Sequence, residues 1–67
     1  MPELKEIKDL TKPNQVQGTT ESKLCIALVS HILTTRVSYS ERDTMIYQFY
    51  NEYITTHELI EWLENNR

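Results

Sequence analysis

From residue 20 onward, apolar residues recur at the spacing of a helix in three successive stretches. The first, residues 20–36, contains an unbroken apolar run at 24–29. A run this dense also suits a buried strand, but about sixteen residues pass without a turn signal, and this length favours a helix. We expect this helix to be the central element of the core. Its apolar residues fall in two adjacent stripes, Leu24, Leu28 and Ile32 on one and Cys25, Val29 and Leu33 on the other.

The second stretch, residues 41–52, follows a helix start signal. A hydroxyl residue stands three positions before a carboxylate in two registers, Ser38 with Glu41 and Ser40 with Asp43, which is the pattern of an N-cap with an acidic first turn. The apolar residues after it repeat as on one face of a helix: Met45, Ile46, Phe49, Tyr50 and Tyr53. Of these, we expect Phe49, Tyr50 and Tyr53 to lie in the core.

The third stretch, residues 56–65, has the most complete start signal. Thr55 and Glu58 have the spacing of a capping box, and Ile54 and Leu59 have the spacing of a hydrophobic staple. We therefore expect a short connection between the second and third helices. The inward positions of this last helix are Leu59, Ile60 and Leu63, with Trp62 beside them.

The N-terminal segment is harder to assign. Leu4, Ile7 and Leu10 are three residues apart, which fits either a short docked helix or a tail that orders only against a partner. Residues 11–20 are polar and contain Pro13 and Gly18, so they predict a linker. The sequence thus predicts an all-α fold: a small three-helix domain at 19–67, preceded by a flexible or short-helical N-terminal arm and linker at 1–18.

With 67 residues, the chain has room for one domain. Its single cysteine, Cys25, cannot form an intramolecular disulfide, and its apolar neighbours predict a buried, unreactive thiol. The first residues lack the apolar core of a signal peptide, and no apolar run is long enough to span a bilayer. We therefore expect an intracellular, cytoplasmic protein without membrane contact. Its richness in Ile, Thr, Asn, Glu and Tyr is typical of an AT-rich genome, such as that of many phages.

The sequence offers little for catalysis. Residues 57–61 begin like the His-Glu-x-x-His motif of zinc proteases, but Glu61 stands where the second histidine ligand must be. A solvated helix face is the preferred interpretation of His57, and a partly exposed, hydrogen-bonded side chain that of His31. The single glycine excludes a glycine-rich phosphate loop. We expect a non-enzymatic protein with no cofactor and no metal.

The charge is unevenly distributed. The chain carries a net −3, and residues 37–67 alone carry six acidic against two basic residues, a net −4. A phosphate-binding surface would be basic, so direct nucleic-acid binding is disfavoured. A helix-turn-helix arrangement of the last two helices would present three glutamates to DNA, where cations and amides are needed.

These observations favour a small protein-interaction module, acting as a regulator or accessory subunit. Its acidic last helix would meet a partner protein with a basic surface, and the module itself would be a monomer or weak dimer. Tyr and Trp are frequent interface anchors. The candidate partner-binding residues are Tyr47, Glu58, Glu61, Trp62 and Glu64. The alternative is a nucleic-acid-associated accessory protein that binds DNA through its few basic residues or mimics DNA charge.

One local resemblance concerns the junction between the last two helices. Residues 49–59, FYNEYITTHEL, resemble a motif in the N-terminal helical module of Ras-family exchange factors. This segment covers under a fifth of the chain, and a capped helix that follows another helix gives the same pattern by itself. We therefore carry no residue role over from that family.

Overall fold

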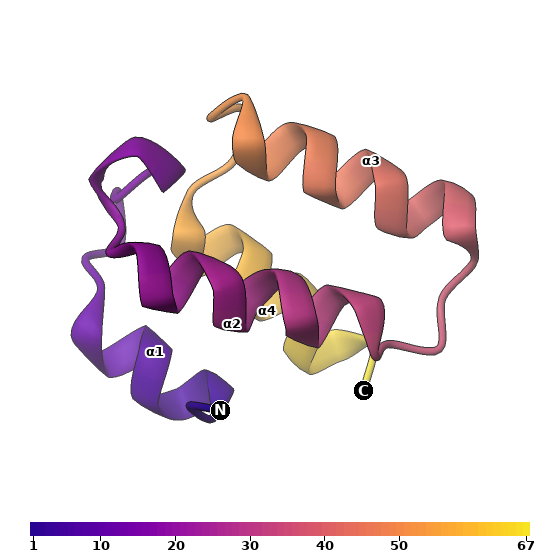
Figure 1. The fold of residues 1–67 in the computed structure, drawn as a ribbon, viewed down its shortest axis with the longest axis horizontal. Helices are drawn as coiled ribbons and strands as arrows, with labels where there is room; N and C mark the ends of the chain where they lie inside the picture. Colours follow the sequence, from indigo (N-terminus) through magenta and orange to yellow (C-terminus); the bar gives the residue numbers. More distant parts are fainter.

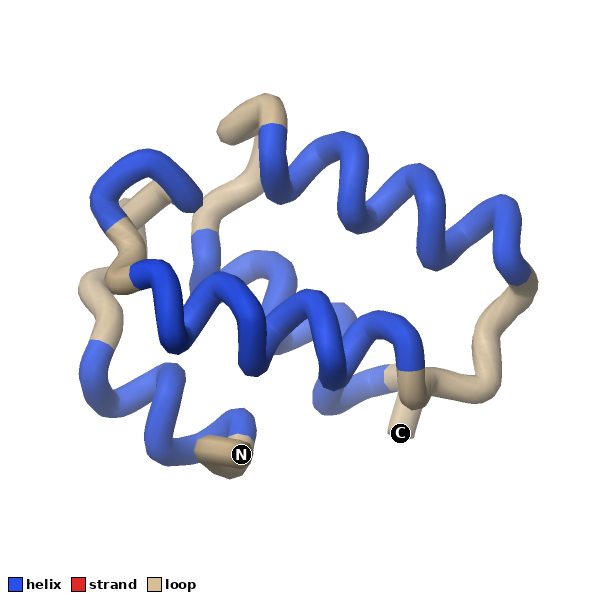
Figure 2. Tube along the Cα trace, viewed as in Figure 1, coloured by secondary structure: helices blue, strands red, loops and turns tan.

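The computed structural model describes residues 1–67, which form α-helices, one short 3₁₀ turn and no strand (Figures 1 and 2). The elements in chain order are α1 (Leu4–Leu10), η1 (Gln17–Thr19), α2 (Ser22–Leu33), α3 (Tyr39–Tyr50) and α4 (Thr56–Asn65). The all-α fold class and the three main helices predicted from the sequence are confirmed.

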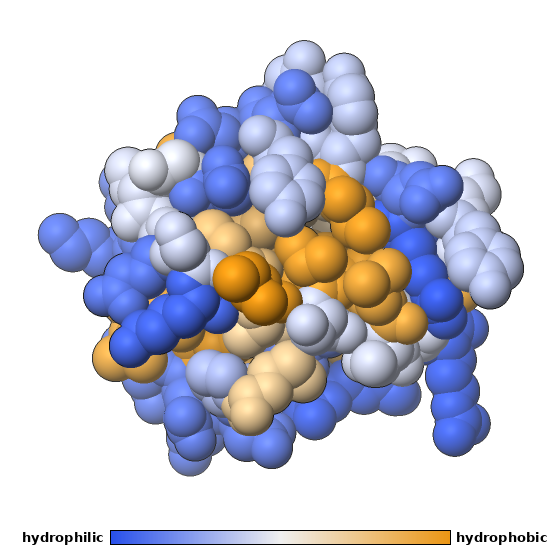
Figure 3. All heavy atoms as spheres, viewed as in Figure 1, coloured by the Kyte–Doolittle hydropathy of each residue, from blue (hydrophilic) through white to orange (hydrophobic).

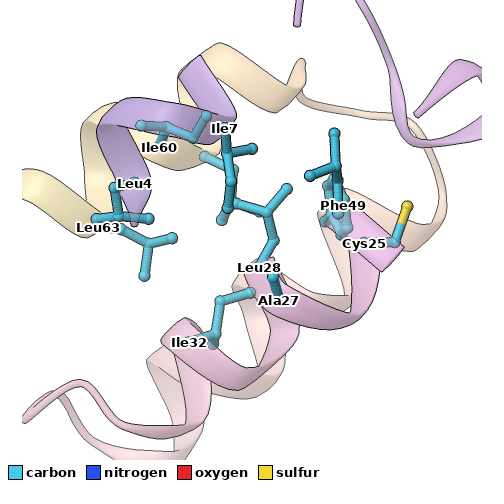
Figure 4. Packing of buried hydrophobic residues seen from close by; sticks show 11 residues of the cluster. Leu4, Ile7, Cys25, Ala27, Leu28, Ile32, Phe49, Ile60 and Leu63 are labelled. Atoms are coloured by element: carbon cyan, nitrogen blue, oxygen red, sulfur yellow. The ribbon is translucent and has the colours of Figure 1, made fainter. Parts of the chain in front are cut away.

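The helices are arranged around α2, which lies at the front of the view in Figure 1. α3 runs antiparallel to α2, α4 passes behind α2, and α1 packs beside α4. Eleven buried apolar residues fill the space between them (Figure 4). Every α-helix contributes to this cluster: Leu4 and Ile7; Leu24, Cys25, Ala27, Leu28 and Ile32; Phe49; and Leu59, Ile60 and Leu63.

The starts of α3 and α4 follow local signals in the sequence. The hydroxyl of Ser38 accepts the N–H of Glu41 at 3.3 Å, so α3 uses the first of the two possible registers and lies two residues before the predicted range 41–52. At α4, the Thr55 hydroxyl accepts the N–H of Glu58 and the Glu58 carboxylate accepts the N–H of Thr55, at 3.1 and 3.0 Å. This reciprocal pair is the predicted capping box, and α4 has the predicted bounds.

α2 is shorter than the sequence predicts, because it ends at Leu33 rather than near Arg36. The N–H of Thr34 donates to the carbonyls of Ser30 and His31, and the Thr35 hydroxyl donates to the carbonyl of Ile32 at 2.7 Å. The bond to Ser30 is the last regular helical bond, whereas the bonds to His31 and Ile32 satisfy carbonyls that a continuing helix would use, so the chain turns here.

The N-terminal segment is a short helix docked on the core. Leu4 and Ile7 are buried, and α1 packs against α4. The segment predicted to be a linker is also ordered on the core. The N–H of Thr56 donates to the Gln15 carbonyl at 2.8 Å, and the hydroxyls of Thr20 and Thr56 lie 2.9 Å apart. Long-range contacts of this kind leave no periodic pattern in the sequence.

The prediction that Tyr50 and Tyr53 lie in the core is wrong, whereas Phe49 is fully buried. A helix packed on one side buries a limited sector, and Tyr50 lies at the edge of the sector centred on Phe49. Tyr53 follows the end of α3, outside the helical face. None of the helices combines the length and the apolar composition that crossing a membrane requires.

Candidate functional site

The acidic residues predicted to bind a partner all lie on α4, but two of them already make intramolecular contacts. Glu58 closes the capping box. Glu64 pairs with Lys8 of α1 through a 3.4 Å contact between Oε1 and Nζ. Glu61 is exposed and makes no ion pair. Of the three predicted glutamates, only Glu61 therefore has a carboxylate without an internal partner.

The two aromatic residues predicted as anchors have different surroundings. Trp62 is half-buried and packs against the core cluster, so its indole is mainly a structural side chain. Tyr47 lies on α3 and is 57% exposed. Its ring contacts that of Tyr53, with centroids 5.9 Å apart and planes inclined at 40°. Four of the five predicted residues thus lie on α4, and Tyr47 lies on α3.

The sequence predicted that His57 lies on a solvated helix face, and this prediction is wrong. His57 is half-buried, and its Nε2 lies 3.0 Å from the Lys8 carbonyl and 2.9 Å from the Thr11 carbonyl. A carbonyl can only accept, so Nε2 carries the hydrogen and is shared between the two oxygens. His57 thus ties the end of α1 to α4.

The structure exposes an apolar surface on α2, the helix expected to be the central element of the core. Ile26 and Leu33 lie on the solvent side of α2 and are 67% and 55% exposed. They are seven residues apart, which is two helical turns or about 10.5 Å, so both project from the same side. Val29, between them, is half-buried. We call these three residues the α2 stripe.

Part of the surface of α3, which packs against α2, is also formed by apolar and aromatic side chains. Ile46 on α3 is half-buried, and Tyr50, one turn later, is 50% exposed. Figure 3 shows this face as a hydrophobic area over α2 and the adjoining part of α3, surrounded by polar atoms. The sequence signal was the apolar run at 24–29, which has more apolar residues than one face of a helix can bury. Periodicity alone does not say which of them remain outside.

The one thiol of the protein has no chemical role that the structure supports. Cys25 is buried, as predicted, and its sulfur lies 3.7 Å from the Thr20 carbonyl. Burial raises the pKa of the Cys25 thiol, an effect that the hydrogen bond from Gln17 partly offsets. A raised pKa keeps the group as the less nucleophilic thiol.

Comparison of the chain with family models, with curated proteins and with solved structures finds no match. The resemblance at residues 49–59 is therefore not extended to a family assignment.

Proposed function

We propose that this protein is a non-enzymatic interaction module, a regulator or accessory subunit, that binds an amphipathic helix of a partner protein across α2 and α3. The observation that carries the proposal is the exposed α2 stripe. Ile26 and Leu33, two turns apart on α2, offer the apolar face of a partner helix two contact points. An apolar patch rimmed by polar atoms is typical of a protein–protein contact.

The charge of the rest of the protein favours a partner with a basic rim. Residues 37–67, which include α3 and α4, carry a net −4. Complementary charge around an apolar contact mainly raises the association rate and excludes partners of like charge. The exposed carboxylates produce a negative electric field that attracts a basic partner, whether or not they touch it. The acidic face of α4 thus remains part of the proposal, in a steering role, with Glu61 as its free carboxylate.

A capture experiment with matched variants tests the proposal. Ile26→Gln combined with Leu33→Gln makes the α2 stripe polar without touching the buried cluster. Leu10→Gln is the control, because Leu10 is 68% exposed on α1, outside the stripe. We expect the parent and Leu10→Gln to retain the same protein from native-host extract, and the double variant to lose it. All three should unfold at nearly the same temperature.

Equal retention by the double variant and the parent would refute the α2 stripe as the binding surface. Retention of no protein by the parent would refute the interaction module itself in that extract. Sedimentation equilibrium tests whether the α2 stripe instead binds a second copy of this chain. A dimer of the parent that the double variant abolishes would replace the partner protein with self-association.

A further inference from the structure

A cavity of about 240 Å³ opens beside the C-terminal end of α2, and no residue of the α2 stripe lines it. It lies where the N-terminal end of α1 meets the C-terminal ends of α2 and α4. Leu4 and Leu63 form its apolar part, and both are buried members of the core cluster (Figure 4). The remaining lining residues are polar or cationic: His31, Thr34, Thr35, Arg36, Asn66 and Arg67.

The residues that line this cavity include two arginines and no aspartate or glutamate, in a chain whose net charge is −3. Arg36 makes no ion pair. Arg67 approaches Glu3 at 3.9 Å, with both side chains more than half exposed. Exposed pairs at this distance contribute little, so a ligand can compete for Arg67.

The guanidinium groups of Arg36 and Arg67 are not hydrogen-bonded to the helix ends beside the cavity. At these ends, the Thr34 hydroxyl donates to the His31 carbonyl at 3.0 Å, and the Asn66 amide donates to the Trp62 carbonyl at 2.7 Å. The His31 ring donates through Nε2 to the Pro2 carbonyl at 2.9 Å. The arginines are therefore not needed as caps for these carbonyls.

We propose that this cavity binds an oxyanion, a carboxylate or phosphate group, carried on a short apolar stem. A guanidinium group offers parallel N–H donors that match a carboxylate or phosphate in a two-pronged contact. The apolar part of the lining is small, because Leu4 and Leu63 are only 2% and 1% exposed, so only a short stem can be accommodated. The volume lies just below the usual range of small-molecule pockets, roughly 300–1,000 Å³, which restricts the ligand to a small one.

This chemistry has two possible sources, a free small molecule or an acidic side chain of a partner. Two kinds of probe separate them. Butyl phosphate and hexanoate represent the free ligand, and a blocked Leu-Glu dipeptide represents the side chain. Amide shifts of the whole protein in NMR titrations report the site, and hexanol and hexylamine test whether the charge is required.

We expect saturable binding of the anionic probes, with shifts confined to residues around the cavity, and no binding of hexylamine. Arg36→Gln and Arg67→Gln should each weaken binding about tenfold, the loss of one charge-assisted contact. Glu3→Gln should strengthen binding, because it frees Arg67. Lys23→Gln is the matched control, since Lys23 is a well-exposed cation that does not line the cavity.

Three results would overturn the proposal: no saturable binding of any anionic probe, equal binding of hexanol, or equal weakening by Lys23→Gln. The Ile26→Gln/Leu33→Gln variant should bind the probes as the parent does. The titration therefore tests the cavity independently of the α2 stripe.

Discussion

Glu52 has a left-handed backbone, with φ of 61°, a conformation that favours glycine. It ends α3 in a Schellman arrangement: the N–H of Tyr53 donates to the Gln48 carbonyl at 2.9 Å, and that of Glu52 to the Phe49 carbonyl at 3.2 Å. The contact between Tyr47 and Tyr53 is the side-chain contact that usually closes such an end. The first role of this tyrosine pair is therefore to terminate a helix.

Glu52→Gly should raise the free energy of unfolding by roughly 0.5–1 kcal/mol, because relief of the left-handed backbone exceeds the extra chain entropy of glycine. Urea unfolding measures the change. Glu52→Ala is the control: it also removes the carboxylate that lies over Gly18, but it keeps a Cβ at this φ. An equal gain with alanine would assign the effect to the carboxylate.

Thr55→Ala should lower the free energy of unfolding by about 1 kcal/mol, the usual contribution of an N-cap. Thr56 is different, because its side chain is fully buried and its hydroxyl contacts that of Thr20. Thr56→Val keeps the volume and removes that hydrogen bond, so it should also destabilise the fold. A far-UV circular dichroism melt of each variant checks both. An unchanged melt for Thr55→Ala would mean that the capping box contributes nothing to stability.

At the scale of elements, the helices with local signals were predictable and their long-range attachments were not. Caps and staples lie within a few residues of one another, so Ser38 and Thr55 identify the starts of α3 and α4 directly. The docking of α1 depends on His57, 46 residues or more along the chain from its backbone acceptors. A single sequence holds no signal for such a pair.

The docking of α1 gives a prediction of its own. Ile7→Ala should lower the free energy of unfolding by about 2–4 kcal/mol, because Ile7 is fully buried in the common core. Leu10→Ala, on the exposed side of the same helix, should change it by less than about 0.5 kcal/mol. Chemical denaturation of both variants measures the difference. Equal, small effects would mean that α1 does not contribute to the cooperative core.

The candidate site was predictable only as a class of surface. The sequence located the acidic charge in the second half of the chain, and five of its six acidic residues lie on α3 and α4, with Glu52 between the two helices. It did not show that Lys8 would pair with Glu64, nor that Ile26 and Leu33 would face solvent, because both depend on how α1 and α3 are placed. Side-chain type sets what a surface can attract, and packing decides which side chains reach it.

At the scale of the whole molecule, apolar contact and charge are separated: Figure 3 shows hydrophobic atoms over α2, and in the same view α4 lies behind α2 (Figure 1). Charges that do not touch the partner act through their long-range electric field, which salt screens within about 10 Å at 0.1 M. The carboxylates of α4 should therefore affect how fast a basic partner arrives, and much less how long it stays.

Glu61→Gln combined with Glu64→Gln tests this steering role. Both side chains are exposed or half-exposed, and the pair with Lys8 contributes little, so the unfolding temperature should hardly change. Association with the partner that the α2 stripe retains should slow several-fold at low salt and match the parent at high salt. The control is Glu6→Gln combined with Asp9→Asn, an equal loss of charge on α1. Stopped-flow fluorescence gives the rates. If both double variants slow association equally, only the net charge matters, and the acidic face of α4 has no particular role in guiding the partner.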